Sequence, residues 1–218
     1  AIDQTTDTPT NNFATLNPLV LGSYATLSEG NLKLTGNTAS DSGSTIATIG
    51  FPQSGKWYIE EKMTDETGQF PESGVFNDIE TDNFQSNLNA AGGIASHSAG
   101  VSINCSGNIM VDGSSAFSIS HILDGQIKQY AIDMDNGAIY IGLNNTWYNS
   151  GNPTSGASKT GAIDTWTSGT RSNMMFGASA YNGSDGEVNF GNPTFTGTDQ
   201  SDGNSRGSFE YAPPSGYL

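Results

Sequence analysis

The chain has 218 residues, and its seven Lys or Arg against 22 Asp or Glu give a formal charge of −15 at pH 7. This charge excludes a surface that tracks nucleic-acid phosphates and disfavours binding to anionic membranes. No apolar run approaches the roughly 18–20 residues of a membrane-spanning helix. The single cysteine, Cys105, is too little for an internal disulfide or a structural zinc site, so we expect it to be a small buried hydrophobe.

The first residues differ in composition from the rest of the chain. Residues 1–11 are polar, contain a proline and lack an apolar cluster that could anchor them. We therefore interpret residues 1–11 as an N-terminal arm or linker and residues 12–218 as one domain. The chain begins without a signal-peptide pattern, which favours a processed chain or a piece of a longer one.

Strand signals separated by turn residues recur along the chain, and no stretch shows the sustained apolar period of a helix. In chain order, the expected strands cover residues 24–27, 31–34, 44–51, 56–63, 129–134, 138–143, 174–181 and 187–190. Asn136-Gly137 predicts the clearest hairpin, because Asn-Gly is the strongest short turn signal. Residues 79–91 are the best candidate for a helix or loop. The pattern predicts an all-β, antiparallel two-sheet sandwich or jelly roll, with less than about a tenth of the residues in helix.

The alternation within residues 56–63 raises a question about the core. One face carries Trp57, Ile59, Glu61 and Met63, and the other carries Tyr58, Glu60 and Lys62. One of these faces must therefore carry a carboxylate inward or lie partly in solvent. The residues that we expect to be largely buried are Trp57, Ile132, Met134, Ile139, Phe176 and Phe190.

Four segments resemble motifs of one family, in the same order. They are GKWYIE at 55–60, AIDMDNGAIY at 131–140, ASAYNG with VNFG over 178–191, and FEYAPPSGY at 209–217. Together they resemble the SPRY domain in its concanavalin-like jelly-roll form, over roughly residues 12–217. The resemblance implies a SPRY-like β-sandwich.

The lead-in NFATLNPL at residues 12–19 is similar to that of SPRY-like domains in long structural proteins of bacteriophages. This resemblance implies a non-enzymatic structural or adhesion domain at the virion surface, in a tail fibre, head fibre or capsid decoration. Its partners would be other virion proteins or host-surface glycans, and we expect a homo-oligomer. Two alternatives stay open: a purely architectural subunit that self-associates, and a secreted concanavalin-like carbohydrate-active enzyme.

Aromatic residues beside polar turn residues form the candidate glycan site. A flat ring stacks on the apolar face of a sugar while an amide bonds its hydroxyls. The candidate residues are Trp147, Tyr148, Asn149, Trp166, Tyr181 and Asn182. The competing interpretation is that Trp147 and Trp166 fill the sandwich core or cap its open end. Because cations are scarce, a glycan ligand is expected to be neutral.

The sequence assigns no catalytic residue and no cofactor. Asp78, Glu80 and Asp82 place oxygen ligands at alternate positions, as a calcium loop does, but Asn stands where an EF-hand needs its Gly and its Glu. Solvated turns are the expected interpretation, with calcium as the alternative. For glycoside hydrolysis, Glu60 could pair with Glu187 or Asp133, but nothing selects such a pair.

Overall fold

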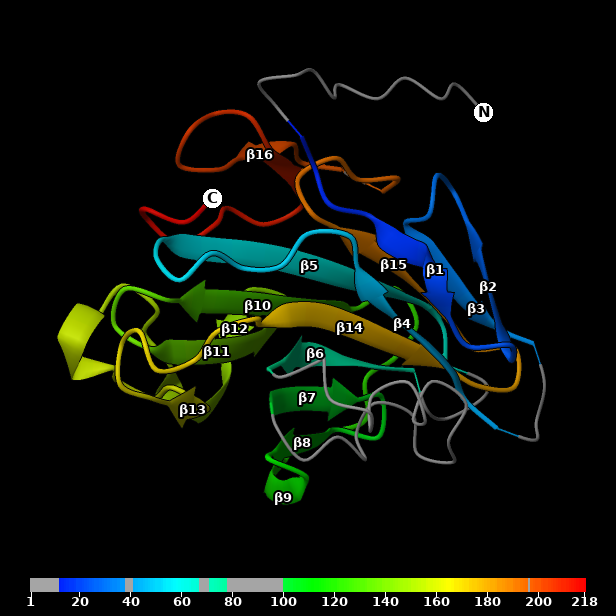
Figure 1. Ribbon diagram of the computed structural model, residues 1–218, viewed down its shortest axis with the longest axis horizontal. Coiled ribbons are helices and arrows are strands. Elements are labelled where there is room, and N and C mark those ends of the chain that lie inside the picture. The colour runs from blue at the N-terminus through cyan, green and yellow to red at the C-terminus, as the bar shows by residue number, and fades with distance from the viewer. Residues whose placement is uncertain (1–11, 38–40, 67–70, 78–99, 196) are drawn as a thin grey trace.

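The computed structural model describes residues 12–37, 41–66, 71–77, 100–195 and 197–218, and the statements below concern these residues. Two antiparallel sheets pack face to face (Figure 1). From edge to edge, the seven-stranded sheet contains β1 (Leu16–Leu21), β4 (Gly43–Ala47), β14 (Met175–Ala180), β6 (Glu72–Phe76), β7 (Gly100–Asn104), β8 (Asn108–Val111) and β9 (Ser114–Ser118).

The eight-stranded sheet forms the second layer. From edge to edge it contains β12 (Thr146–Trp147), β11 (Ala138–Leu143), β10 (Ile127–Asp133), β5 (Lys56–Asp65), β15 (Asp185–Asn189), β3 (Lys33–Gly36) and β2 (Ala25–Ser28), with β13 (Asp164–Thr165) also beside β11. Within the described residues, the only helical turns are the 3-10 helices η2 (Tyr148–Ser150) and η3 (Gly156–Ser158). The predicted all-β, antiparallel two-sheet sandwich is confirmed.

The predicted turns explain how the chain moves within and between the sheets. β2 pairs with β3, and β10 pairs with β11 around Gly137, whose φ of +72° suits the turn. β14 and β15 are also found, but they lie in different sheets, so the turn at Asn182-Gly183 carries the chain across the sandwich. The helix-or-loop candidate at 79–91 and the arm at 1–11 lie outside the described residues.

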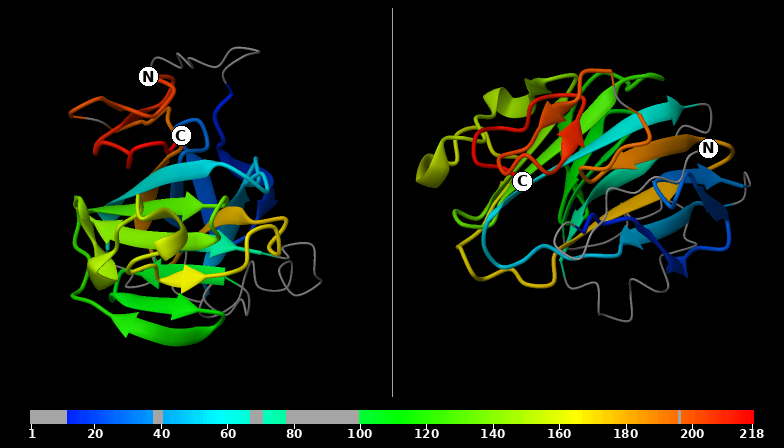
Figure 2. Two further views of the ribbon diagram at one scale, coloured as in Figure 1. Left: turned by 90° about the vertical axis from the view of Figure 1, so that its left-hand side faces the viewer. Right: turned by 90° about the horizontal axis from the view of Figure 1, so that it is seen from above.

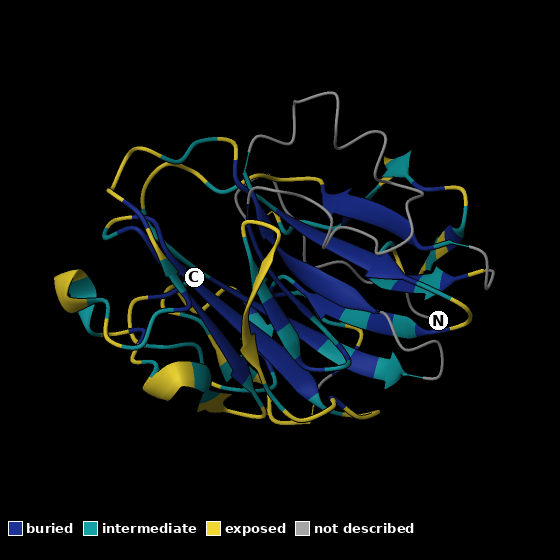
Figure 3. Cartoon of the chain, turned by 90° about the horizontal axis from the view of Figure 1, so that it is seen from below, coloured by how far each residue is buried: buried dark blue, intermediate teal, exposed yellow. Residues whose placement is uncertain are grey.

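The core lies between the two sheets, where the strands are buried along most of their length (Figure 3). Ile132, Met134, Ile139 and Phe176 are at most 1% exposed, as predicted, and Cys105 is fully buried. Trp57 and Phe190 are less buried than these four residues: both are packed against the core but keep part of their surface exposed. β15 pairs with β5 from Glu60 onward only, so at Trp57 this edge of β5 is met by Leu218 and not by a full strand.

Strand β5 buries a carboxylate on each of its faces. Glu61, 2% exposed, lies between the sheets and forms an ion pair with Lys128, with Oε2 and Nζ 2.9 Å apart. Ser73 donates a hydrogen bond to the same carboxylate. Glu60, fully buried, lies on the outer face beneath the C-terminal residues. The alternation of β5 therefore gives no solvent-facing side at either glutamate.

Residues 197–218, here called the C-terminal lobe, lie over the outer face of β5 (Figure 2). The lobe contains the small sheet of β16 (Gln200–Ser201) and β17 (Ser208–Phe209). The Phe209 ring packs edge-on against Tyr58, with centroids 5.0 Å apart. Leu218 exchanges backbone hydrogen bonds with Lys56 and Tyr58, which extends the sheet along the free edge of β5.

Candidate functional site

The aromatic side chains near β12 pack against apolar clusters and are not exposed on the surface as a sugar-binding site requires. Trp147 is half-buried against the apolar cluster on the outer face of the eight-stranded sheet. Tyr148 packs on the central core, and burial raises its pKa to about 12. Asn149 is exposed. Trp166 is only 8% exposed and lies in the core, with the Arg171 guanidinium 4.9 Å from its ring centroid. Trp166 therefore follows the competing interpretation, in which it fills the core.

The other two candidate glycan residues lie elsewhere. Tyr181 and Asn182 belong to a turn held to Gly36 by backbone hydrogen bonds in both directions, Gly36 to Ser184 and Gly183 to Gly36. Gly36 ends β3, which lies near the opposite edge of the eight-stranded sheet from β12. The structure thus does not bring the six residues together on one surface. The calcium candidates Asp78, Glu80 and Asp82 lie outside the described residues.

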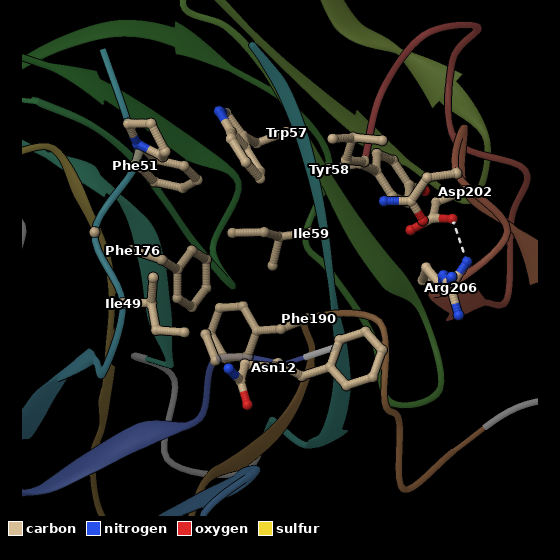
Figure 4. Close-up of a pocket in the computed structure, with 16 residues that line it drawn as sticks. Asn12, Ile49, Phe51, Trp57, Tyr58, Ile59, Phe176, Phe190, Asp202 and Arg206 are labelled. Carbon is tan, nitrogen blue, oxygen red and sulfur yellow. Dashed lines mark hydrogen bonds between the residues drawn. The ribbon is translucent and has the colours of Figure 1, made fainter. Parts of the chain in front are cut away.

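A different group of residues encloses a cavity of about 350 Å³ beside the free edge of β5 (Figure 4). Residues from distant parts of the chain line it: the segment before β1, the β4–β5 connection, strands β5 and β14 with Phe190 after β15, and the C-terminal lobe. The lining residues are Asn12, Phe13, Ala14, Ile49, Gly50, Phe51, Pro52, Trp57, Tyr58, Ile59, Phe176, Phe190, Asp202, Asn204, Arg206 and Leu218. Its size is typical of sites that hold one small ligand or one large side chain.

The floor of the cavity is aromatic and continuous with the core. The Phe176 ring packs edge-on against Phe190, with centroids 5.5 Å apart, and against Tyr130 behind it at 5.4 Å. Gly191 follows Phe190 with φ at +109°, and a Cβ there would lie 2.7 Å from the ring of Phe13. Only glycine fits both requirements, so this residue allows Phe13 to close one side of the cavity.

Trp57 forms another wall, and its ring is fixed from behind. Its Nε1 donates a hydrogen bond to the carbonyl oxygen of Ser54 at 3.2 Å, and the ring lies against Gly55, whose φ is +94°. The Gly55 backbone N–H donates to Oδ1 of Asp135 at 2.8 Å, which ties this turn to the β10–β11 hairpin. The ring is therefore held in place while part of it stays exposed to the cavity.

Glu60 holds the C-terminal lobe on the sheet. Its carboxylate accepts hydrogen bonds from the backbone N–H groups of Glu210 and Tyr211 at 2.9 and 2.8 Å, from Asn189 Nδ2 at 3.1 Å and from the Tyr58 hydroxyl at 3.0 Å. Burial raises the pKa of Glu60, and the four donors oppose that rise. This carboxylate, weighed from the sequence as a hydrolytic acid, is thus occupied by donors and does not line the cavity.

No protein-family model matches the sequence, and no curated protein matches it. Solved structures do match. The SPRY domain of human HERC1 aligns with a TM-score of 0.56 at 14% identity, over 79% of this chain and 96% of that one. The TRIM65 PSpry domain aligns with a TM-score of 0.52 at 12% identity, over 81% and 92%. Stonustoxin aligns with a TM-score of 0.50 at 16% identity, over 81% of this chain and 26% of that one.

The chain has a SPRY-like fold. At these identities the likeness shows the fold alone. It agrees with the resemblance drawn from the four motifs, and it does not bear on a bacteriophage origin. Two of the segments that resemble SPRY motifs also line the cavity, because GKWYIE supplies Trp57 and VNFG supplies Phe190. Sequence reasoning assigned both rings to the core. The one available signal was Gly55 directly before the strand, a residue type that often marks a backbone in a left-handed conformation.

Proposed function

We propose that this SPRY-fold chain is a non-enzymatic recognition domain whose cavity receives an apolar side chain of a partner protein. The observation that carries the proposal is the aromatic wall of Phe51, Trp57 and Phe190, three partly buried side chains that line the cavity. Aromatic side chains held rigidly beside a pocket are typical anchoring points for a protein partner, because they bury a large apolar area at small entropic cost.

We also propose the setting suggested by the lead-in at residues 12–19, which is the surface of a bacteriophage virion. There the partner is another virion protein. The proposed glycan site has weaker support, because its six residues do not form one surface and Trp166 is buried. The architectural and enzymatic alternatives stay open. No observation on the described residues favours either of them.

Short Gly/Ser-based peptides with Phe, Trp, Leu or Ala at the centre provide a direct test. We expect the first three to bind the wild-type chain and the Ala peptide not to bind. Trp57→Ala should weaken binding by at least about tenfold, because it removes one wall of the cavity. Trp147→Ala is the matched control, since it truncates a half-buried tryptophan that does not line the cavity.

Both variants must first show a cooperative thermal transition, so that lost binding cannot be attributed to unfolding. Equal binding by Trp57→Ala and the wild type would overturn the proposal. Loss of binding in Trp147→Ala alone would move the site to the β12 edge.

A further inference from the structure

The positive charges of this acidic chain are almost all engaged. All seven Lys and Arg residues lie in the part of the chain that the structure describes, and six of them contact a carboxylate, a carbonyl oxygen or an aromatic ring. The contacts are Lys33 with Asp185, Lys56 with Asp133, Lys128 with Glu61, Arg171 with Asp164, Lys159 with the Trp166 carbonyl, and Lys62 with the Phe195 ring.

Arg206 is the exception among these seven residues. Its side chain is exposed, and its guanidinium has no ion pair, carbonyl acceptor or ring contact among the described residues. Arg206 also lines the cavity, at its rim (Figure 4). Among the seven Lys and Arg residues, all of which the structure describes, the one without such a contact therefore lies at the edge of the aromatic pocket.

The nearby Asp202 positions Arg206 without neutralising its side chain. Oδ1 of Asp202 accepts the backbone N–H of Arg206 at 2.9 Å, and Oδ2 accepts the backbone N–H of Gly207 at 3.0 Å. Both carboxylate oxygens thus bind the backbone of the turn. The turn is held in one conformation while the guanidinium keeps its donors for a ligand.

We propose that the partner carries a carboxylate close to its anchoring apolar residue, and that Arg206 binds this carboxylate. The inference rests on the proposed function, since the apolar side chain enters the same cavity. A planar guanidinium pairs with a carboxylate through two parallel hydrogen bonds, which gives direction as well as attraction. The ligand class is therefore a peptide segment with Asp or Glu beside a large apolar residue.

The charge of the whole chain makes this local recognition selective. A domain with a formal charge of −15 repels acidic segments in general, so only a segment that reaches Arg206 gains from its charge. A basic segment would be attracted by the surface as a whole, but at the cavity rim it would meet Arg206 and be repelled.

The test uses Phe-centred peptides whose neighbouring residue is Asp, Asn or Lys, bound to the wild-type chain and three variants. We expect the Asp peptide to bind about three- to tenfold more tightly than the Asn peptide. Arg206→Gln should abolish that preference, and Arg206→Glu should shift it toward Lys. Lys62→Gln, which removes an equal charge that does not line the cavity, should keep the preference.

The outcomes separate the two proposals. If Phe peptides bind and Trp57→Ala weakens them, but Asp and Asn peptides bind equally, the inference about Arg206 is overturned and the recognition cavity stands. If no peptide binds, both proposals are overturned. A third outcome is that the chain forms a dimer at higher concentration and that Trp57→Ala abolishes this dimer. The occupant of the cavity is then a second copy of the chain, and the proposed acidic partner is wrong.

Discussion

Two regions of this SPRY fold hold tryptophans near polar turns, and they use them differently. Beside the cavity, Trp57 is half-buried on the part of β5 that β15 does not reach. Near β12 and β13, Trp166 is 8% exposed in the core under the Arg171 guanidinium. The Trp57 ring is held by Ser54 and Gly55 and stays partly exposed, whereas the Trp166 ring is buried in the core between the sheets. The difference shows that an aromatic residue beside a turn stays partly exposed here where the neighbouring strand β15 ends before reaching it.

The largest expected effect is on stability, at Trp166. Trp166→Ala should lower the free energy of unfolding by about 3–5 kcal/mol, because it removes a large buried ring and leaves a cavity in the core. Peptide binding at the Trp57 cavity should be unchanged while the variant stays folded. Urea denaturation measures the first effect. A loss below about 1 kcal/mol would show that Trp166 is not a core residue.

The second-largest expected effect is that of Glu60→Gln, which should lower the free energy of unfolding by about 2–4 kcal/mol. The amide would present an N–H₂ group to donors that now bind a carboxylate oxygen, so at least two hydrogen bonds are lost in a buried site. Because Glu60 holds the C-terminal lobe, Arg206 and Asp202 should also become more mobile, which weakens peptide binding. Denaturation and binding are measured on the same variant.

The control for this variant is Glu187→Gln. Glu187 lies on the neighbouring strand β15, and its carboxylate accepts a hydrogen bond from the Thr194 hydroxyl in a solvent-accessible position. We expect Glu187→Gln to change the free energy of unfolding by no more than about 0.5 kcal/mol. Equal effects of the two substitutions would contradict the assignment of Glu60 as the residue that fastens the lobe.

Trp57→Ala should cost less stability than Trp166→Ala, about 1–2 kcal/mol, because only part of its ring is removed from water. Its main effect is the loss of peptide affinity described above. The two tryptophans should therefore separate stability from binding. A stability loss at Trp57 as large as at Trp166 would show that the cavity wall is part of the core.

The smallest expected effect is at Tyr148, whose pKa of about 12 reflects burial. Its pKa is higher in the folded than in the unfolded chain, so its contribution to stability is complete below about pH 10 and is lost as the pH rises through 12. An ultraviolet difference titration against Tyr148→Phe measures this group alone. Ionisation near pH 10 would indicate an exposed ring and would revive the β12 edge as a binding surface.

The strands were predictable because their signals are local. The Asn136-Gly137 turn and the alternating residues around it fixed the β10–β11 hairpin without reference to the rest of the chain. The four motifs in order also gave the SPRY-like fold. Both depend on residues that are close in sequence.

The cavity was not predictable because it depends on distant contacts. Glu60 binds the backbone of Tyr211, 151 residues away, and this contact is one of several long-range contacts that hold the lobe carrying Arg206 against the sheet. Trp57 and Phe190 follow the alternation of core residues, and their exposure depends on where β15 stops pairing with β5. Tyr181 follows β14 and Trp147 ends the short strand β12, but the sheet order that separates them is not encoded in either segment.

The most direct test of the recognition cavity uses the three tryptophans of the chain as reporters. Each indole N–H gives one signal in a ¹⁵N–¹H correlation spectrum, assigned by single Trp→Phe substitutions. On titration with the Asp-Phe peptide, the Trp57 signal should shift in a saturable way, while the Trp147 and Trp166 signals stay in place. A shift of Trp147 with an unmoved Trp57 would contradict the account and place binding at the β12 edge.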